Sequence, residues 1–166
     1  MDKTEEMTVS RKPFLEVLSE IQAVLKEDNK KIMAKVGMNL GQKWAQSKRD
    51  EGKIPSSIKE LFDWIAYYLQ NELLFAQKVD SIQNGNEYTL KYGIFDSDEY
   101  QCLLCCGAIV KKKGGEPACP VSQFAQGTTR VFKKDLKISK MQLKGIVKPE
   151  SKKPGACDQT FIIETR

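Results

Sequence analysis

The spacing of apolar residues changes near residue 80, and this change limits the folds that the chain can adopt. Before this point, apolar side chains recur every three or four positions, as they do on one face of a helix. After it, most apolar side chains alternate with polar ones, as in strands with one buried face. Helices followed by strands predict an α+β fold, with N-terminal helices packed on a mostly antiparallel sheet.

Three helices are expected in the first part of the chain, over residues 11–27, 30–48 and 58–74. Ser57 and Glu60 form a capping-box pattern at the start of the third. In the second, Gly37 and Gly41 lie four residues apart and therefore share a face. Another backbone could approach this face closely, or the two glycines could make room for a bulky core side chain.

The second part of the chain carries strand and turn signals. Asn84 and Gly85 predict a tight hairpin, followed by a strand that points Tyr88, Leu90, Tyr92 and Ile94 to one side. Residues 134–147 predict a long strand with a slip near Lys140, and residues 157–166 predict the last strand. Residues 100–110 are apolar and could be helical, and residues 122–132 fit neither pattern clearly.

The length of 166 residues suits a flexible arm over residues 1–10 and a single domain over residues 11–166. No apolar run approaches the roughly 20 residues that a membrane-spanning helix needs. The first residues lack the order of a signal peptide, so we expect a cytoplasmic protein. Twenty-seven basic residues against 22 acidic ones give a net charge of +5, and we expect the lysine clusters to face solvent instead of nucleic acid.

The chain contains no histidine, which removes the most common general base and every imidazole ligand for a metal. It also lacks phosphate-cradling glycine loops and the nucleophile-elbow motif. These absences favour a binding role over a catalytic one.

Five cysteines carry most of the remaining chemistry. Cys102 and Cys105 have the two-residue gap that lets two thiolates bind one metal ion. With Cys119 and Cys157 they could complete a tetrahedral zinc site, and Cys106 is then the thiol left out. The same residues are compatible with an iron–sulfur cluster, with a redox-active pair, or with small buried side chains.

Three stretches of the sequence point to a known family. They are VGMNLGQKWAQ in the second helix, YQCLLCCGAIV followed by a CP loop, and the closing IVKPESKKPGACDQTFII. In this order, over residues 11–164, the chain resembles the 4VR family of vinyl-reductase-type, predicted hydrocarbon-binding domains, which is related to the vesicle-tethering TRAPP subunits.

The resemblance implies a helix-flanked antiparallel sheet, a homodimer formed through helices, and a pocket for an apolar small molecule between helices and sheet. Several family members hold zinc near this pocket with cysteines and a glutamate. Cys157 matches the last family cysteine, and Cys102, Cys105 and Cys119 match the earlier ones. The chain departs from the family after Glu150, where SKKPGA contains no cysteine.

We therefore expect a non-catalytic binding or sensor module for an apolar small molecule, stabilised by a cysteine zinc site. The expected pocket-lining residues are Tyr68, Tyr88, Tyr92 and Phe124. A cysteine-based redox sensor, an iron–sulfur protein and a cofactor-processing enzyme of the same family are the alternatives. Because histidine is absent, such an enzyme would need a metal-bound water or a carboxylate.

Overall fold

The structure is a computed structural model of the whole chain, and it describes residues 20–21, 24–25, 28–73, 78–92, 120–147 and 157–166. Within these ranges the helices are α2 (Asn29–Asp50), α3 (Ile58–Tyr67), the π-helix η2 (Tyr68–Glu72) and α5 (Pro120–Phe132). The strands are β1 (Val79–Asn84), β2 (Glu87–Tyr92), β3 (Ile138–Val147) and β4 (Cys157–Thr165). This arrangement is the α+β fold that the sequence predicts.

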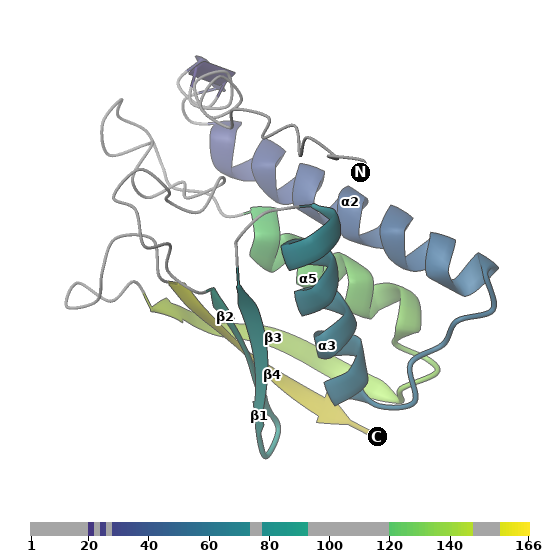
Figure 1. The fold of residues 1–166 in the computed structure, drawn as a ribbon. Coiled ribbons are helices and arrows are strands. Elements are labelled where there is room, and N and C mark those ends of the chain that lie inside the picture. Colours follow the sequence, from purple (N-terminus) through teal and green to yellow (C-terminus); the bar gives the residue numbers. More distant parts are fainter. Residues whose placement is uncertain (1–19, 22–23, 26–27, 74–77, 93–119, 148–156) are drawn as a thin grey trace, which may run out of the picture.

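The four strands form one antiparallel sheet in the order β1-β2-β4-β3. Figure 1 shows the helices gathered on one side of this sheet, with α3 over β1 and β2 and with α2 farthest from the strands. The helix α5 lies against α2 along its length and also contacts α3. The helices therefore form two tiers, with α2 in the tier that lies farther from the sheet.

The hairpin between β1 and β2 follows the sequence prediction with a shift of one residue. Asn84 is the last residue of β1 and pairs with Glu87, so the two-residue turn consists of Gly85 and Asn86. Gly85 has a φ of 60°, which a residue without a Cβ atom adopts without steric penalty.

The strand β3 is predicted over residues 134–147 but begins at Ile138, because residues 133–137 form the turn after α5. Its pairing with β4 shifts between Ile138 and Lys140, where the sequence predicts a slip, and again between Leu143 and Gly145. Such shifts bend a strand and increase its twist.

The two faces of the sheet differ sharply in polarity. Tyr88 pairs with Phe161 and Leu90 pairs with Gln159, and these four side chains are buried beneath the helices. On the opposite face, ion pairs join Lys91 to Asp158, Lys140 to Glu164 and Lys144 to Glu87 across neighbouring or next-neighbouring strands. The core therefore lies between the helices and one face of the sheet only.

The start of α3 confirms the capping-box prediction in part. Ser57 Oγ accepts a hydrogen bond from the backbone N–H of Glu60 at 3.1 Å, as an N-cap serine does. The carboxylate of Glu60 does not reach back to Ser57, because it accepts from the backbone N–H and the hydroxyl of Ser56 instead, each at 2.6 Å.

The segment of uncertain periodicity, residues 122–132, is helical and forms most of α5. Pro120 occupies the first turn, where its missing N–H leaves no intrahelical bond unmade. Most of the expected first helix lies outside the described residues, as do the flexible arm and residues 100–110. No described helix combines the length and the apolar character needed to cross a membrane.

Candidate functional site

The helices α2 and α5 touch through their backbones. A Cβ atom added at Gly37 would lie 2.0 Å from the carbonyl oxygen of Pro120, and one at Gly41 would lie 2.2 Å from that of Phe124. From the other side, a Cβ atom at Gly127 would lie 2.3 Å from the carbonyl oxygen of Met38. These distances are far too short for any side chain, so of the two alternatives that the sequence left open for Gly37 and Gly41, a neighbouring backbone and not a bulky side chain fills the space.

This close approach fixes Phe124 beside α2, one turn from Trp44. The ring centroids of Trp44 and Phe124 are 5.7 Å apart, and those of Trp44 and Tyr68 are 4.7 Å apart. Tyr68 and Phe124 are stacked, with centroids 5.1 Å apart and planes 3° from parallel. Three helical elements thus contribute one ring each to a cluster that we call the aromatic triad: Trp44 from α2, Tyr68 from η2 and Phe124 from α5.

The π-helix places Tyr68 in the triad. At this point α3 widens, and the backbone N–H of Leu73 donates to the carbonyl of Tyr68 at 2.9 Å. Asn71 Nδ2 donates to the carbonyl of Tyr67 at 3.0 Å, and Gln70 Oε1 accepts from the backbone N–H of Val79 at 2.9 Å. Side chains therefore support the wider turn and join it to β1. Single π-turns inside helices occur frequently at functional sites.

The triad leaves one polar atom without a partner. Trp44 Nε1 is inaccessible to solvent, and no hydrogen-bond acceptor among the described residues reaches it. An indole N–H only donates, and a buried donor that lacks an acceptor is rare in folded proteins.

The four expected pocket-lining residues fall into two groups. Tyr68 and Phe124 come together in the triad, whereas Tyr88 and Tyr92 lie on the buried face of β2. The ring of Tyr88 packs on Phe62 with centroids 5.1 Å apart, and Gln83 Nε2 donates to its hydroxyl at 3.1 Å. The sequence prediction omitted Trp44 as a site residue, although its place on the apolar face of the second helix is visible in the sequence.

Burial affects both tyrosine hydroxyls. It raises the pKa of Tyr88 above its usual value. For Tyr68 burial is again the main cause of a raised pKa, and the nearby carboxylate of Glu72 adds to it. Both hydroxyls therefore stay protonated through the physiological pH range, and neither adds negative charge to the buried region.

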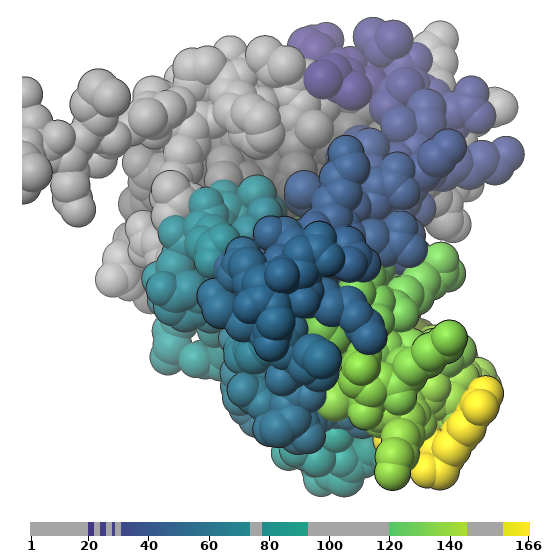
Figure 2. Space-filling model, turned by 90° about the vertical axis from the view of Figure 1, so that its right-hand side faces the viewer, coloured from purple at the N-terminus to yellow at the C-terminus, as the bar shows by residue number. Residues whose placement is uncertain are grey.

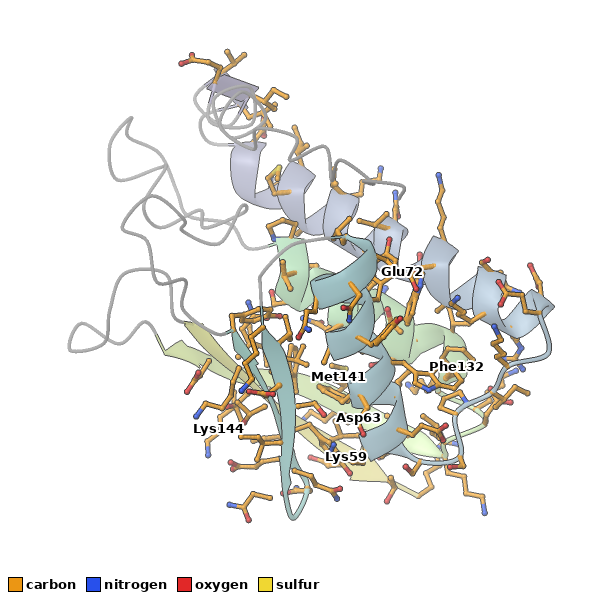
Figure 3. All side chains as sticks on the ribbon, viewed as in Figure 1. Lys59, Asp63, Glu72, Phe132, Met141 and Lys144 are labelled. Atoms are coloured by element: carbon orange, nitrogen blue, oxygen red, sulfur yellow. The ribbon has the colours of Figure 1, made fainter. Side chains whose placement is uncertain are left out.

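A polar cluster links α3 to β1 away from the triad. Lys59 Nζ donates to Ser81 Oγ at 2.9 Å and contacts Asp63 Oδ1 at 2.5 Å, and the Ser81 hydroxyl also hydrogen-bonds to Asp63. Figure 3 shows Lys59 and Asp63 together on the lower part of α3. Among the described residues, the side-chain hydrogen bonds of Lys59, Asp63 and Ser81 stay within this cluster, so we interpret it as a contact that holds α3 on the edge of the sheet.

Of the four predicted zinc ligands, only Cys157 belongs to a described element. It is the first residue of β4 and pairs with Tyr92, the last residue of β2. Cys102, Cys105 and Cys119 lie outside the described residues, as does Cys106. Among the residues that the structure describes, no three cysteine, aspartate or glutamate side chains converge on a common point.

The pairing of Tyr92 with Cys157 nevertheless has a consequence for the metal site. The segment that carries Cys102 and Cys105 follows Tyr92 in the chain, and Tyr92 lies directly beside the first residue of β4. The same segment ends with Cys119, which precedes Pro120 at the start of α5. This connectivity fits a four-thiolate site, because the segment starts next to the fourth cysteine.

Comparison with known proteins adds no assignment to this geometry. No family model matches the chain, and no curated protein is significantly similar to it.

Proposed function

We propose that this protein is a non-catalytic module that binds an apolar, ring-containing small molecule at the aromatic triad. The single observation that carries the proposal is the meeting of Trp44, Tyr68 and Phe124 from three separate helical elements. Small-molecule sites are lined mainly by apolar and aromatic side chains with few polar groups, and they often lie between helices. The triad has this composition, and the resemblance to hydrocarbon-binding domains supports the same function.

The π-helix supports the proposal because it joins the triad to the sheet. Tyr68 begins the wider turn, and Gln70 within it holds the first strand through the N–H of Val79. A ligand that shifted the ring of Tyr68 would therefore act on an element that is bonded to β1. Such a connection is what a sensor module requires to pass on a binding event.

Binding can be tested with naphthalene derivatives as probes and with the intrinsic fluorescence of Trp44. A Trp64→Phe protein keeps Trp44 as its only tryptophan, since the chain contains two. We expect quenching or a spectral shift that saturates with probe concentration. The matched control is Tyr67→Ala, because Tyr67 is 62% exposed on α3 and forms no part of the triad.

The variant that tests the site is Tyr68→Ala, which removes one of the three rings of the triad. We expect it to weaken probe binding about tenfold or more while Tyr67→Ala leaves binding unchanged, because stacked aromatic contacts contribute strongly to affinity. Equal probe affinity in the two variants would contradict the proposed site.

We further propose that Cys102, Cys105, Cys119 and Cys157 hold a zinc ion. Zinc bound by four thiolates would join β4 to the segment between β2 and α5 and would stabilise the fold. The pairing of Cys157 with Tyr92 supports this ligand set. Native mass spectrometry of protein purified without added metal should show one bound zinc, whereas an unmetallated mass with all thiols open to alkylation would end the proposal. A loss of two hydrogens on mild oxidation would favour the redox alternative instead.

A second copy of the chain is the partner that we propose for α2. Ile32, Val36 and Leu40 form a row along this helix and are 39%, 50% and 38% exposed. In an antiparallel pair of α2 helices with the two-fold axis at Val36, Ile32 of each copy would face Leu40 of the other. Sedimentation should give a dimer that Val36→Glu converts to a monomer, while Ile82→Glu, on the outer sheet face, leaves it intact.

A further inference from the structure

Trp44 Nε1 is a buried donor for which the described residues supply no acceptor. Its contacts within the triad are the rings of Tyr68 and Phe124, at centroid distances of 4.7 and 5.7 Å. Leaving a buried N–H without an acceptor is energetically unfavourable. A group from outside the protein that accepts this hydrogen bond therefore gains binding energy that an apolar group does not.

The indole is also held in place. Gly41, three residues before Trp44, lies against the backbone of α5, and Ala45, directly after it, is completely buried. Thr128 Oγ1 donates to the carbonyl of Gly41 at 3.3 Å and adds a further link between the two helices. Because the backbone on both sides of Trp44 is held in place, we do not expect a shift of α2 to bring the donor to an acceptor among the described residues.

A water molecule is a poor partner for this donor. Buried waters typically make about three hydrogen bonds, so they need several polar groups around them. The two rings that contact Trp44 present aromatic surface, and within the part of the chain that the structure describes no acceptor reaches Nε1. A mainly apolar molecule with one acceptor atom fits such surroundings better, since its ring can contact the aromatic surfaces while its acceptor meets the N–H.

We propose that the ligand of this site is an apolar ring compound that carries a carbonyl or ether oxygen, and that this oxygen accepts a hydrogen bond from Trp44 Nε1–H. The inference rests on the proposed function, because it specifies the ligand class for the same triad. It predicts that Trp44 selects among ligands of the same shape by their ability to accept a hydrogen bond.

The test compares two probes of nearly equal shape, 2-acetylnaphthalene and 2-isopropenylnaphthalene. The first has a carbonyl oxygen where the second has a methylene group. Calorimetric titration of the full chain should give about tenfold tighter binding of the ketone. In Trp44→Phe, which keeps an aromatic ring but removes the donor, this preference should disappear.

Trp64→Phe is the matched control, since Trp64 is the other tryptophan and packs edge-on against Phe132 at 6.3 Å. It should keep the preference for the ketone. An equal affinity for both probes in the unmodified protein, or the same preference in Trp44→Phe, would overturn the inference and leave the proposed site standing. Failure of either probe to bind the unmodified protein would overturn the proposed function together with this inference.

A second measurement does not depend on a variant. In protein labelled with ¹⁵N-tryptophan, the Nε1–H resonance of Trp44 should move downfield when the ketone is added and should move less with the alkene. The Nε1–H resonance of Trp64 serves as the internal reference and should stay in place. A resonance of Trp44 that responds equally to both probes would contradict the proposed hydrogen bond.

Discussion

Two helix contacts in this protein are built in opposite ways. The helix α3 packs on the sheet through large side chains, with Phe62 between the rings of Tyr88 and Phe161 at 5.1 and 5.6 Å. The helices α2 and α5 pack through glycines, which have no side chain, so that Gly37 and Gly41 lie against backbone atoms of α5. The contact of α3 with the sheet is therefore destabilised when a side chain is made smaller, and the contact of α2 with α5 is destabilised when a side chain is added.

The difference explains where the aromatic triad forms. Figure 2 shows the blue C-terminal part of α2 and the loop after it bordering the green surface of α5. Because the backbones meet, Trp44 and Phe124 lie close together at the edge of this contact. Their ring centroids are 5.7 Å apart. A contact made by large side chains would hold the two helices farther apart.

The largest loss of stability is expected from Phe62→Ala, in the contact between α3 and the sheet. Phe62 is completely buried, so its removal leaves a cavity between α3 and the sheet. Such substitutions lower the free energy of unfolding by about 3–5 kcal/mol. Urea denaturation checks the value, and Ile82→Ala on the outer sheet face serves as the control, since Ile82 is 45% exposed. Similar losses in both variants would contradict the described packing.

A somewhat smaller loss is expected from Gly41→Ala. The added Cβ atom would meet the carbonyl oxygen of Phe124 at 2.2 Å, so the helices must separate. Overpacking of this kind lowers the free energy of unfolding by about 1–3 kcal/mol. It should also weaken probe binding, because the triad depends on the same close approach. Gly145→Ala is the control, since no atom lies within 4 Å of a Cβ atom there. A stable Gly41→Ala protein with unchanged binding would show that the contact is not essential.

The sequence predicted the elements of the fold better than their contacts. Helical and alternating periods are local, so they could be read from α2, α3 and the strands. The sequence of α5 was ambiguous because Gly127, Thr128 and Thr129 disfavour a helix on their own. All three are buried in the structure, and packing against α2 stabilises the helix despite their low helix propensity.

The site was predicted less completely for a physical reason. The triad joins residues 44, 68 and 124, and no local pattern reports on contacts between residues so far apart. The π-turn that orients Tyr68 has no sequence signal that distinguishes it from an ordinary helical turn. Tyr68 and Phe124 were named as candidates because they are aromatic, whereas Trp44 required knowledge of the glycine contact. The metal ligands remain a prediction, since three of the four lie outside the described residues.

A loss of stability smaller than that of Gly41→Ala is expected from Thr128→Val, which removes a hydroxyl and keeps the shape of the side chain. Thr128 is completely buried and its hydroxyl donates to Gly41, across the contact between α2 and α5. Loss of such a hydrogen bond costs about 1 kcal/mol. In the control, Thr129→Val, the lost bond goes to Ala125 within the same helix, so the loss should be smaller. Thermal denaturation that ranks Thr129→Val as the more damaging change would contradict a role of Thr128 between the helices.

The smallest expected effect is on how stability depends on pH, and it again distinguishes the start of α3 from the contact between α2 and α5. Hydrogen bonds from the hydroxyl and then the backbone N–H of Ser56 lower the pKa of Glu60, while slight burial and the charge of Asp63 oppose this. Because the pKa is lower in the folded chain, Glu60 stabilises the start of α3 at neutral pH. This stabilisation is lost as the pH falls from the ordinary glutamate pKa of 4.5 through the lowered folded value.

Glu60→Gln should therefore slightly flatten the decline in stability between neutral and acidic pH, as measured by urea denaturation at a series of pH values. Glu60 is exposed at the surface, so solvent screening keeps the change small. Around Gly41 the contact between α2 and α5 is made by Gly37, Gly41, Gly127 and Thr128, and none of these side chains ionises. An ionisable contact lies at the end of α2, where Arg49 donates to the carbonyl of Val131 and pairs with Asp135, each at 2.9 Å. Because Arg49 lies about two helical turns from Gly41, destabilisation by Gly41→Ala should be nearly the same at pH 7 and pH 4. A clearly pH-dependent effect of Gly41→Ala would mean that this ion pair is coupled to the glycine contact, and the contrast with the start of α3 would then not hold.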